Sequence, residues 1–353
     1  MSNLELKQIT KRFPGVTALN DVSFDVQDSE FFILLGPTGA GKTTTLRVIA
    51  GLERQEEGTV LFDGEPVDNL APAGRDVAFV FQQYSLYPTM SVYDNLAFPL
   101  RSPLRRTPEG EIRKRIQEIA EVLRIPHLLE RKTAHLSGGE MQRVSIGRAI
   151  VREPRIFLMD EPLSNLDAKL RESLRVELQH LQKTQGSTTL FVTHDQIEAL
   201  TMADRIAVLN LGRIIQIGTP EDIYDRPVTT FVAQLVGTPR INLLKSNRED
   251  STLYIMNSDL HLPSPHEYTV PGEFLLGIRP EDILPHPEGK FAGQILLTEP
   301  LGVQTVVHIR SGEQTLSSLI PGMSTLKIGD NVRFNILAER LHCFTLDGKR
   351  VQR

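Results

Sequence analysis

Short apolar runs alternate with longer amphipathic segments through the first two thirds of the chain. The run FFILL at 31–35 ends at Gly36, and the segment KTTTLRVIAGL at 42–52 follows soon after. A fully apolar run of this length predicts a strand buried on both faces, and the later segment is predicted to be a helix. Further buried strands are predicted at 77–81, 156–160 and 188–193. This alternation is typical of an α/β fold.

Two hairpins and a helical region interrupt the alternation. Asp63-Gly64 lies between two β-rich pieces and favours a tight turn, and the segment 205–218 predicts a second hairpin that turns around 210–212. Apolar residues recur at helical spacing after Pro108, at Ile112, Ile116, Ile119 and Leu123. We therefore expect a helical subdomain over about 88–150, inserted into the α/β core.

The pattern changes again after residue 235. Prolines become frequent, and the segments between them are short and strand-like: FLLGI, GQILLTEPL, QTVVHIR, NVRFNIL and HCFTL. Short strands of this kind favour a small β-barrel-like domain. We thus predict two domains, at 1–235 and 236–353, and a length of 353 residues fits two cores better than one.

Composition narrows the function classes further. The chain has 39 Lys and Arg against 44 Asp and Glu, a net charge of -5, which argues against a general nucleic-acid binder. The single cysteine, Cys343, permits no intrachain disulfide and fits a reducing compartment. The N-terminus lacks a secretory pattern and the run at 31–35 is too short to span a bilayer, so another chain must do any spanning. Scattered histidines predict no metal cluster: His261, His266, His286, His308 and His342.

The sequence GPTGAGKT at 36–43 matches the phosphate-binding pattern G-x-x-x-x-G-K-[ST], and it lies between a predicted strand and a predicted helix, as that pattern requires. Its glycines allow main-chain N–H groups to point inward at phosphates. Lys42 can then reach the β- and γ-phosphates of ATP, and the Thr43 hydroxyl can ligate Mg²⁺. The residues predicted to bind ATP here are Gly36, Pro37, Thr38, Gly39, Ala40, Gly41, Lys42, Thr43 and Thr44.

Two carboxylates follow the apolar run at 156–159, where ligands bind in open α/β sheets. Asp160 is predicted to hold Mg²⁺. Glu161, the next residue, would point elsewhere, and we expect it to act as the general base toward an attacking water. Taken alone, the pair is better explained as a solvated helix cap. Together with the phosphate loop, it favours catalysis.

A second candidate phosphate-binding loop occurs at Ser137-Gly138-Gly139-Glu140, ahead of a predicted helix. Small residues let N–H groups approach an anion, and a helix N-terminus adds the positive end of a dipole. In isolation the same residues are explained as a helix cap. The residues alone do not say why one chain would carry two such loops.

The motifs occur in the order of the ATP-binding-cassette (ABC) family, which the chain resembles over nearly all of residues 4–235. The phosphate loop is followed by FQQYSLYP, LSGGEMQRVSIGRAI, IFLMDEPLSNLD and FVTHD. The resemblance implies a P-loop NTPase cassette that pairs head to tail with a second copy, so that two chains sandwich each ATP. Ser137, Gly138 and Gly139 would then face the γ-phosphate held by the partner subunit's Lys42.

One position departs from the family pattern. The signature loop of the family usually ends in glutamine, whereas this chain has Glu140, which is also predicted to lie near the partner's ATP. The change adds negative charge where phosphate charge is already high. A carboxylate there also caps the following helix favourably. We therefore do not expect the site to be inactive on this ground.

Four further roles come from the resemblance alone. Gln82 matches the glutamine that touches Mg²⁺ or the water and connects to the membrane subunit, although its neighbour Gln83 leaves the assignment ambiguous. Asp167 matches the aspartate that crosses the dimer. His194 matches the switch histidine at the γ-phosphate, and Phe13 the aromatic that stacks on adenine, although both are more often structural as isolated residues. The predicted catalytic residues are thus Lys42, Glu161 and His194, and the predicted magnesium ligands are Thr43, Gln82 and Asp160.

The resemblance extends, more loosely, to the second domain. The segments FVAQLVGTPRINLL and FLLGIRPEDI are similar to sugar-importer ATPases of the maltose and glycerol-3-phosphate type, whose C-terminal part is an OB-like regulatory domain. ATPases of polyamine, sulfate, molybdate or iron importers carry related domains, so these solutes stay open. Aromatic residues between 82 and 100 match the region that receives a membrane subunit in the family, with ordinary subdomain packing as the alternative.

These features lead us to expect the ATPase subunit of a bacterial importer, bound at the cytoplasmic face of the inner membrane. Its implied partners are ATP, Mg²⁺, a second copy of the chain, two membrane-spanning permease subunits and, indirectly, an extracytoplasmic solute-binding protein, with no nucleic acid. A soluble ABC protein acting on nucleic acid or ribosomes is disfavoured by the single cassette and short insert. An inactive regulatory cassette is disfavoured by the intact motifs.

Overall fold

The computed structural model describes residues 2–103, 107–264 and 272–351. His266 lies outside the described residues. The chain divides into two compact units, Met1–Pro220 and Glu221–Arg353. The domain boundary predicted from the sequence, after residue 235, lies later than this division. The difference consists of the short helices α7 (Pro220–Asp225) and α8 (Thr230–Leu235), which group almost entirely with the second unit. Among the described residues, no helix combines the length and the apolarity needed to cross a bilayer.

A six-stranded sheet forms the centre of the first unit. Its order is β10 (Arg213–Gly218), β9 (Arg205–Asn210), β3 (Phe31–Leu35), β8 (Thr188–Thr193), β7 (Ile156–Asp160) and β6 (Val77–Val80). All pairs are parallel except β10 with β9, which form the predicted hairpin. Every residue of β3, β7 and β8 is buried, which confirms the strands predicted from apolar runs.

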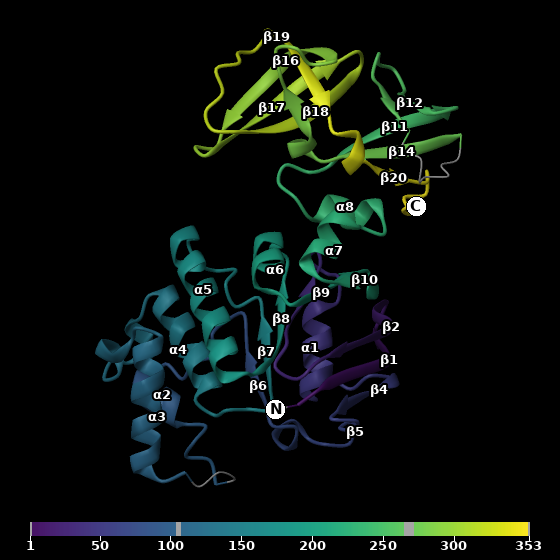
Figure 1. Cartoon of the computed structure of the whole chain (residues 1–353). Coiled ribbons are helices and arrows are strands. Elements are labelled where there is room, and N and C mark those ends of the chain that lie inside the picture. The colour runs from purple at the N-terminus through teal and green to yellow at the C-terminus, as the bar shows by residue number, and fades with distance from the viewer. Residues whose placement is uncertain (1, 104–106, 265–271, 352–353) are drawn as a thin grey trace. The chain divides into compact units, whose positions relative to one another are not determined.

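The strand order brings the sequence motifs to one edge of this sheet. Leu35 at the end of β3 pairs with Thr193 at the end of β8, and Asp160 at the end of β7 pairs with Val192. Because the strands are parallel, the loops that follow them leave from the same edge. The phosphate loop, the Asp160-Glu161 pair and His194 therefore come from three adjacent strands (Figure 1).

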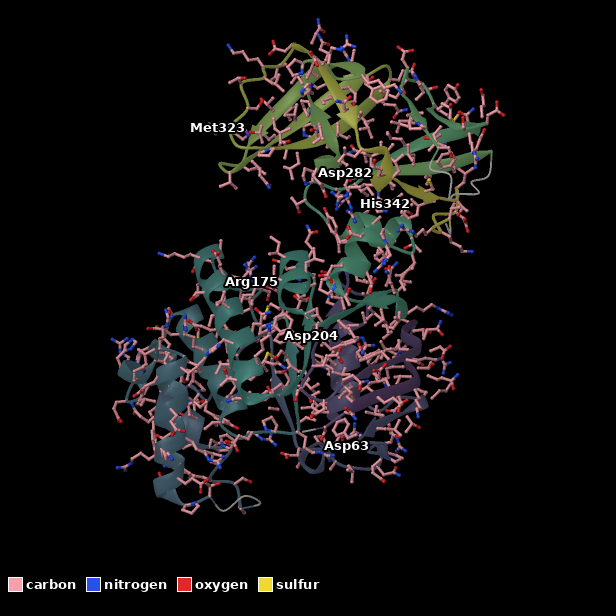
Figure 2. The ribbon with its side chains drawn as sticks, in the orientation of Figure 1. Asp63, Arg175, Asp204, Asp282, Met323 and His342 are labelled. Atoms are coloured by element: carbon pink, nitrogen blue, oxygen red, sulfur yellow. The ribbon has the colours of Figure 1, made fainter. Side chains whose placement is uncertain are left out.

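A second, antiparallel sheet packs in the same unit. Its order is β2 (Val16–Val26), β1 (Leu4–Phe13), β4 (Glu57–Phe62) and β5 (Glu65–Pro66). The Asp63-Gly64 turn joins β4 to β5 as predicted. Asp63, which Figure 2 marks, adopts φ 52° and accepts a hydrogen bond from the main-chain N–H of Asn3 at 2.7 Å. The turn thus connects this hairpin to the start of β1.

Helices complete the first unit. They are α1 (Lys42–Ala50), α2 (Val92–Ala97), α3 (Glu109–Val122), α4 (Gly138–Ile150), α5 (Ala168–Gln185) and α6 (Gln196–Met202), with short 3-10 helices at Pro72–Gly74, Pro126–Leu128 and Thr133–His135. Helices α2, α3 and α4 make up the predicted helical region and gather together (Figure 1). Ile112 and Ile116 of α3 are fully buried, as their spacing predicts.

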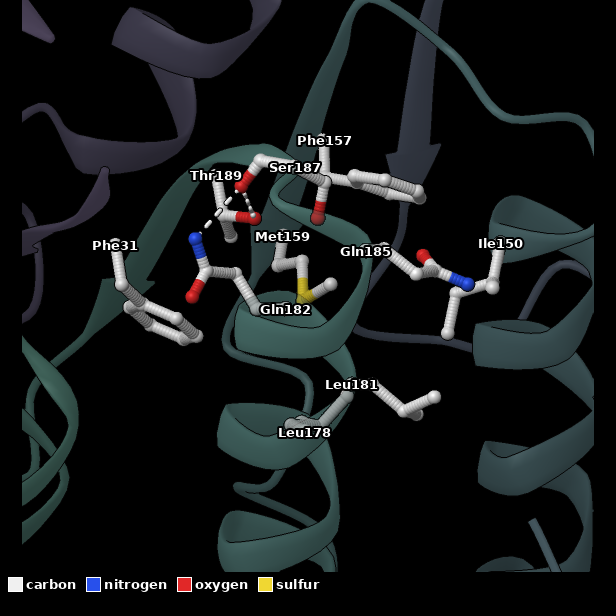
Figure 3. Close-up of a pocket in the computed structure, with 10 residues that line it drawn as sticks. All are labelled: Phe31, Ile150, Phe157, Met159, Leu178, Leu181, Gln182, Gln185, Ser187 and Thr189. Carbon is white, nitrogen blue, oxygen red and sulfur yellow. Dashed lines mark hydrogen bonds between the residues drawn. The ribbon is translucent and has the colours of Figure 1, made fainter. Parts of the chain in front are cut away.

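Helix α5 packs closely on the central sheet. Figure 3 shows Gln182 of α5 beside Ser187 and Thr189, with apolar side chains around them. The Gln182 amide donates hydrogen bonds to the main-chain oxygens of Ser29 and Ser187, at 2.7 and 2.8 Å. The cavity at this contact measures only about 10 Å³, close to the least that a single water molecule needs. We therefore interpret this contact as packed core.

The second unit is built from two five-stranded antiparallel sheets. One has the order β13 (His261–Pro263), β12 (Thr252–Ile255), β11 (Asn242–Glu249), β14 (Glu273–Ile278) and β20 (His342–Phe344). The other has the order β15 (Ile283–Pro285), β19 (Asn331–Ile336), β16 (Phe291–Pro300), β17 (Gln304–Ser311) and β18 (Gln314–Pro321). Short 3-10 helices lie at Pro280–Asp282 and Ala338–Arg340. One apolar cluster joins both sheets and includes Cys343, which confirms the predicted all-β character of this part.

Candidate active site

The main chain of the phosphate loop folds around the Lys42 side chain. Gly41 precedes α1 with φ 109°, and a Cβ atom there would lie 2.5 Å from the Ala18 carbonyl oxygen, so only glycine fits this position. Lys42 is 5% exposed, and its ammonium donates hydrogen bonds to the main-chain oxygens of Gly36 and Pro37 at 3.0 and 3.1 Å. These bonds hold the Lys42 ammonium inside the phosphate loop.

Glu161 lies at the meeting point of three predicted site residues. One carboxylate oxygen, Oε1, lies 3.3 Å from Lys42 Nζ, and the other, Oε2, lies 3.0 Å from His194 Nδ1. The Gln82 amide donates to Oε2 at 3.4 Å. Glu161 itself adopts φ 44°, an uncommon conformation for a residue with a side chain, and its N–H donates to the Val192 carbonyl at 3.0 Å. This turn directs Glu161 away from Asp160 and toward Lys42 and His194.

Asp160 faces the start of α1. The Thr43 hydroxyl donates to its Oδ1 atom at 3.0 Å, and the carboxylate is 5% exposed. Burial raises the pKa of Asp160, and the nearby Glu161 charge adds to this, while the Thr43 hydrogen bond and Lys42 oppose it. The Thr43 hydroxyl and the Asp160 carboxylate place two hard oxygen atoms side by side, which suits Mg²⁺. Gln82, the third predicted ligand, contacts Glu161 and Ser164.

The signature loop forms a capping box. The Ser137 hydroxyl accepts from the Glu140 N–H at 3.4 Å, and the Glu140 carboxylate accepts from the Ser137 N–H at 2.8 Å. The Ser137 hydrogen bonds lower the pKa of Glu140. The predicted capping role of Glu140 is therefore confirmed. A Cβ atom on Gly139 would lie 2.0 Å from Leu170 Cδ2, so a larger residue there would require the Leu170 side chain to move.

The remaining predicted residues lie apart from Glu161. Asp167 caps α5, where its carboxylate accepts from the Leu170 N–H at 3.0 Å. Phe13 is half-buried at the end of β1, and Lys11 Nζ lies 5.0 Å from its ring centroid. Among the described residues of this chain, no hydrogen bond or ion pair joins Ser137, Glu140 or Asp167 to the phosphate loop. Their predicted contacts with nucleotide would have to be made across a dimer.

Sequence reasoning missed several residues around the site. Ser164 donates to the Glu161 carbonyl at 2.9 Å, and the Asn165 amide donates to the Gln82 carbonyl at 3.2 Å. The Asn165 bond ties the segment after Glu161 to the segment that carries Gln82. Both partners are main-chain oxygens, which leave no sequence signal. The polar pair Ser164-Asn165, in the segment that follows the buried strand and Glu161, was the available hint.

Comparison with known proteins decides the family. A model of the ABC transporter family matches residues 19–164, and a model of the TOBE domain matches residues 276–344. The sn-glycerol-3-phosphate import ATP-binding protein UgpC of Brucella abortus biovar 1 is 45% identical, over 99% of this chain and 99% of its own length. The chain belongs to the ABC transporter family. It is an ATP-binding import subunit with ATPase activity, and this confirms the expectation drawn from its motifs.

Two other relatives agree with this placement of the ABC subunit. The trehalose/maltose import ATP-binding protein MalK of Thermococcus litoralis is 44% identical, over 98% of both chains. The dimeric structure of MJ0796, a bacterial ABC transporter cassette, covers 62% of this chain and 98% of its own, with 32% identity and a TM-score of 0.56. The predicted fold class, a P-loop ABC cassette followed by an all-β domain, is confirmed. Within the described residues of the ABC subunit, no group of three or more His, Cys, Asp or Glu residues is arranged to hold a metal.

A buried carboxylate near the site makes the stability of the ABC subunit depend on pH. Glu198 of α6 is 3% exposed, and burial raises its pKa to about 7, against the Thr193 hydrogen bond that lowers it. Between about pH 4.5 and 7, the folded state holds a proton at Glu198 that the unfolded state has lost, so this group's contribution to stability falls as pH rises.

We predict that Glu198→Gln removes this contribution to the pH dependence. Relative to the variant, the wild-type free energy of unfolding should fall by up to about 3 kcal/mol from pH 5 to pH 8. Urea unfolding of both proteins at the two pH values measures the difference, and titrations that they share cancel. Equal pH dependence in the two proteins would contradict the raised pKa of Glu198.

Proposed function

We propose that two copies of this ABC subunit close around two ATP·Mg²⁺ to drive uptake of a carbohydrate or related solute, such as a sugar, a polyol or a glycerol phosphate, through separate membrane subunits. The observation that carries the catalytic part is the contact of one carboxylate, Glu161, with Lys42 and His194 at 3.3 and 3.0 Å. The relatives named for import of sn-glycerol-3-phosphate and trehalose/maltose support the solute class.

The chemistry follows from these contacts. Bound phosphates attract the Lys42 ammonium, which releases Glu161 from its ion pair and leaves the carboxylate ready to accept a proton from water. His194 keeps hold of the other carboxylate oxygen and orients it. Thr43 and Asp160 would hold Mg²⁺, which neutralises phosphate charge when bound. Catalysis then consists of positioning and of electrostatic stabilisation.

The dimer explains the two phosphate-binding loops. Ser137, Gly138 and Gly139 would approach the nucleotide bound by the partner subunit's phosphate loop, and Asp167 would cross the same interface. The positive end of α4 suits an anion there. Phe13 at the end of β1 would stack on adenine.

A cavity in the first unit supports docking of a membrane subunit. It measures about 300 Å³ and its lining includes Phe79, Tyr87, Phe98 and Arg148. Tyr87 and Phe98 are 39% and 47% exposed, and their ring centroids lie 4.6 Å apart. Exposed paired aromatics of this kind suit the anchoring residue of a partner. The segment that carries them begins at Gln82, which links the docking surface to Glu161.

Purification of the tagged chain from gently solubilised native membranes tests this proposal. We expect the chain to bind the cytoplasmic face of the membrane. Two polytopic permease subunits should therefore copurify with it, together with an extracytoplasmic solute-binding protein. Ligand screening on that binding protein would name the solute and separate a carbohydrate from the polyamine, sulfate, molybdate and iron alternatives. A chain that brings ribosomes or DNA, and no membrane protein, would contradict the transporter role and favour a soluble ABC protein.

A further inference from the structure

The residue before His194 is fixed from three directions. Thr193, the last residue of β8, is 2% exposed. Its hydroxyl donates to Glu198 Oε2 at 2.5 Å and accepts from the Asp195 N–H at 2.9 Å. Its carbonyl oxygen accepts from the N–H of Gly36, the first residue of the phosphate loop, at 3.3 Å. One side chain thus fixes the main chain on both sides of His194.

A second set of contacts holds the residue after His194. Asp195 caps α6, where its Oδ1 atom accepts from the Ile197 N–H at 2.7 Å. Its Oδ2 atom lies 3.6 Å from Arg171 Nη1. Arg171, on α5, also donates to the main-chain oxygens of Leu163 and Leu166, at 3.3 and 2.9 Å. Arg171 therefore connects the segment after Glu161 to the segment after His194.

Helix capping alone does not account for Glu198. Asp195 already caps α6, and the Glu198 carboxylate, which lies in the first turn of the same helix, accepts from the Thr193 hydroxyl. A buried carboxylate also costs free energy, and its burial is only partly offset by hydrogen bonds. Glu198 is 3% exposed, and the ionisable groups that act on it are Asp195, Arg171 and His194. A costly buried acid aimed at the hydroxyl beside His194 points to a role in the site.

We propose that Glu198 is a positioning residue for ATP hydrolysis, which acts through the Thr193 hydroxyl to fix the main chain that carries His194. Arg171 and Asp195 complete the arrangement from the opposite side. None of these four side chains needs to touch the nucleotide. The inference rests on the proposed role of His194 as the group that orients Glu161.

The test compares two substitutions of Thr193 in the full-length chain. Thr193→Val keeps the β-branched shape of the strand residue and removes the hydroxyl, whereas Thr193→Ser keeps the hydroxyl and removes a methyl group. We expect Val to lower kcat for ATP at least tenfold while the Kd for ATP changes less than threefold. We expect Ser to restore most of the turnover. Glu198→Leu and Glu198→Gln form a second pair, in which only Gln retains an oxygen acceptor for Thr193.

Each outcome decides a separate point. A Thr193→Val variant with turnover within twofold of wild type would overturn the inference, as would a fall in kcat that Ser fails to restore. Loss of ATP binding in step with kcat would show a general structural effect and would also overturn it. His194→Ala serves as the reference for the proposed function itself. If that variant keeps wild-type turnover, the role of His194 fails, and the result is distinct from any result at Thr193.

Discussion

Replacing Glu161 by glutamine should lower kcat for ATP at least about a hundredfold while ATP binding persists. General-base catalysis typically contributes 10²–10⁴-fold, and a glutamine amide cannot accept the proton of the attacking water. Lys42 keeps its hydrogen bonds to the Gly36 and Pro37 carbonyls, so the phosphate loop retains its shape. Since hydrolysis is what reopens the proposed dimer, the variant should accumulate as an ATP-bound dimer.

Two measurements check this prediction. Phosphate release gives kcat, and size-exclusion chromatography with and without ATP·Mg²⁺ gives the oligomeric state. Glu118→Gln provides the matched control, because Glu118 is an exposed residue of α3 whose ion pair with Lys114 spans 3.9 Å at the surface. It should behave as wild type in both assays. Normal turnover in Glu161→Gln would remove Glu161 from the mechanism.

The sequence was sufficient to predict the strands and motifs of the site. The apolar runs at 31–35, 156–160 and 188–193 are buried on both faces, and this burial leaves a direct mark in the residue pattern. The residue pattern of strands β1 and β2 is less regular, because charged residues and register shifts interrupt them. These two strands were therefore not predicted individually. Their inward faces nevertheless join the main core.

The contacts within the site were less accessible to sequence reasoning. Which strands are neighbours depends on long-range pairing, so the contact of Glu161 with Lys42 was not predicted, and its relation to His194 followed only from the resemblance to a family. The positive φ of Glu161 directs its side chain, yet glutamate carries no local signal for that conformation. The bonds of Arg171 end on main-chain oxygens, which every residue possesses. The capping box was predictable because both partners are side chains at a fixed spacing.

A negative charge at Ser137 should prevent the ATP-dependent dimer without unfolding the chain. Aspartate caps helices as well as serine does, so Ser137→Asp keeps a cap on α4, although it loses the hydrogen bond that the Ser137 hydroxyl donates to the Glu140 carboxylate at 2.8 Å and adds a like charge beside it. In the proposed dimer this carboxylate would face the γ-phosphate bound by the partner. Two like charges 4 Å apart repel by about 4 kcal/mol at the effective dielectric near a protein surface, and 1.4 kcal/mol already weakens association tenfold. We therefore expect at least about tenfold weaker dimerisation.

The experiment uses the Glu161→Gln background, in which hydrolysis does not dissolve the dimer. Analytical ultracentrifugation with ATP·Mg²⁺ measures dimerisation, and nucleotide titration of the monomer measures binding to the phosphate loop. Ser137→Thr is the matched control, because threonine supplies a neutral hydroxyl cap and should still dimerise. Unchanged monomer affinity together with lost dimerisation would locate the effect at the partner's nucleotide. An aspartate variant that dimerises as tightly as the threonine variant would mean that Ser137 does not face phosphate, and the two loops would then need another explanation.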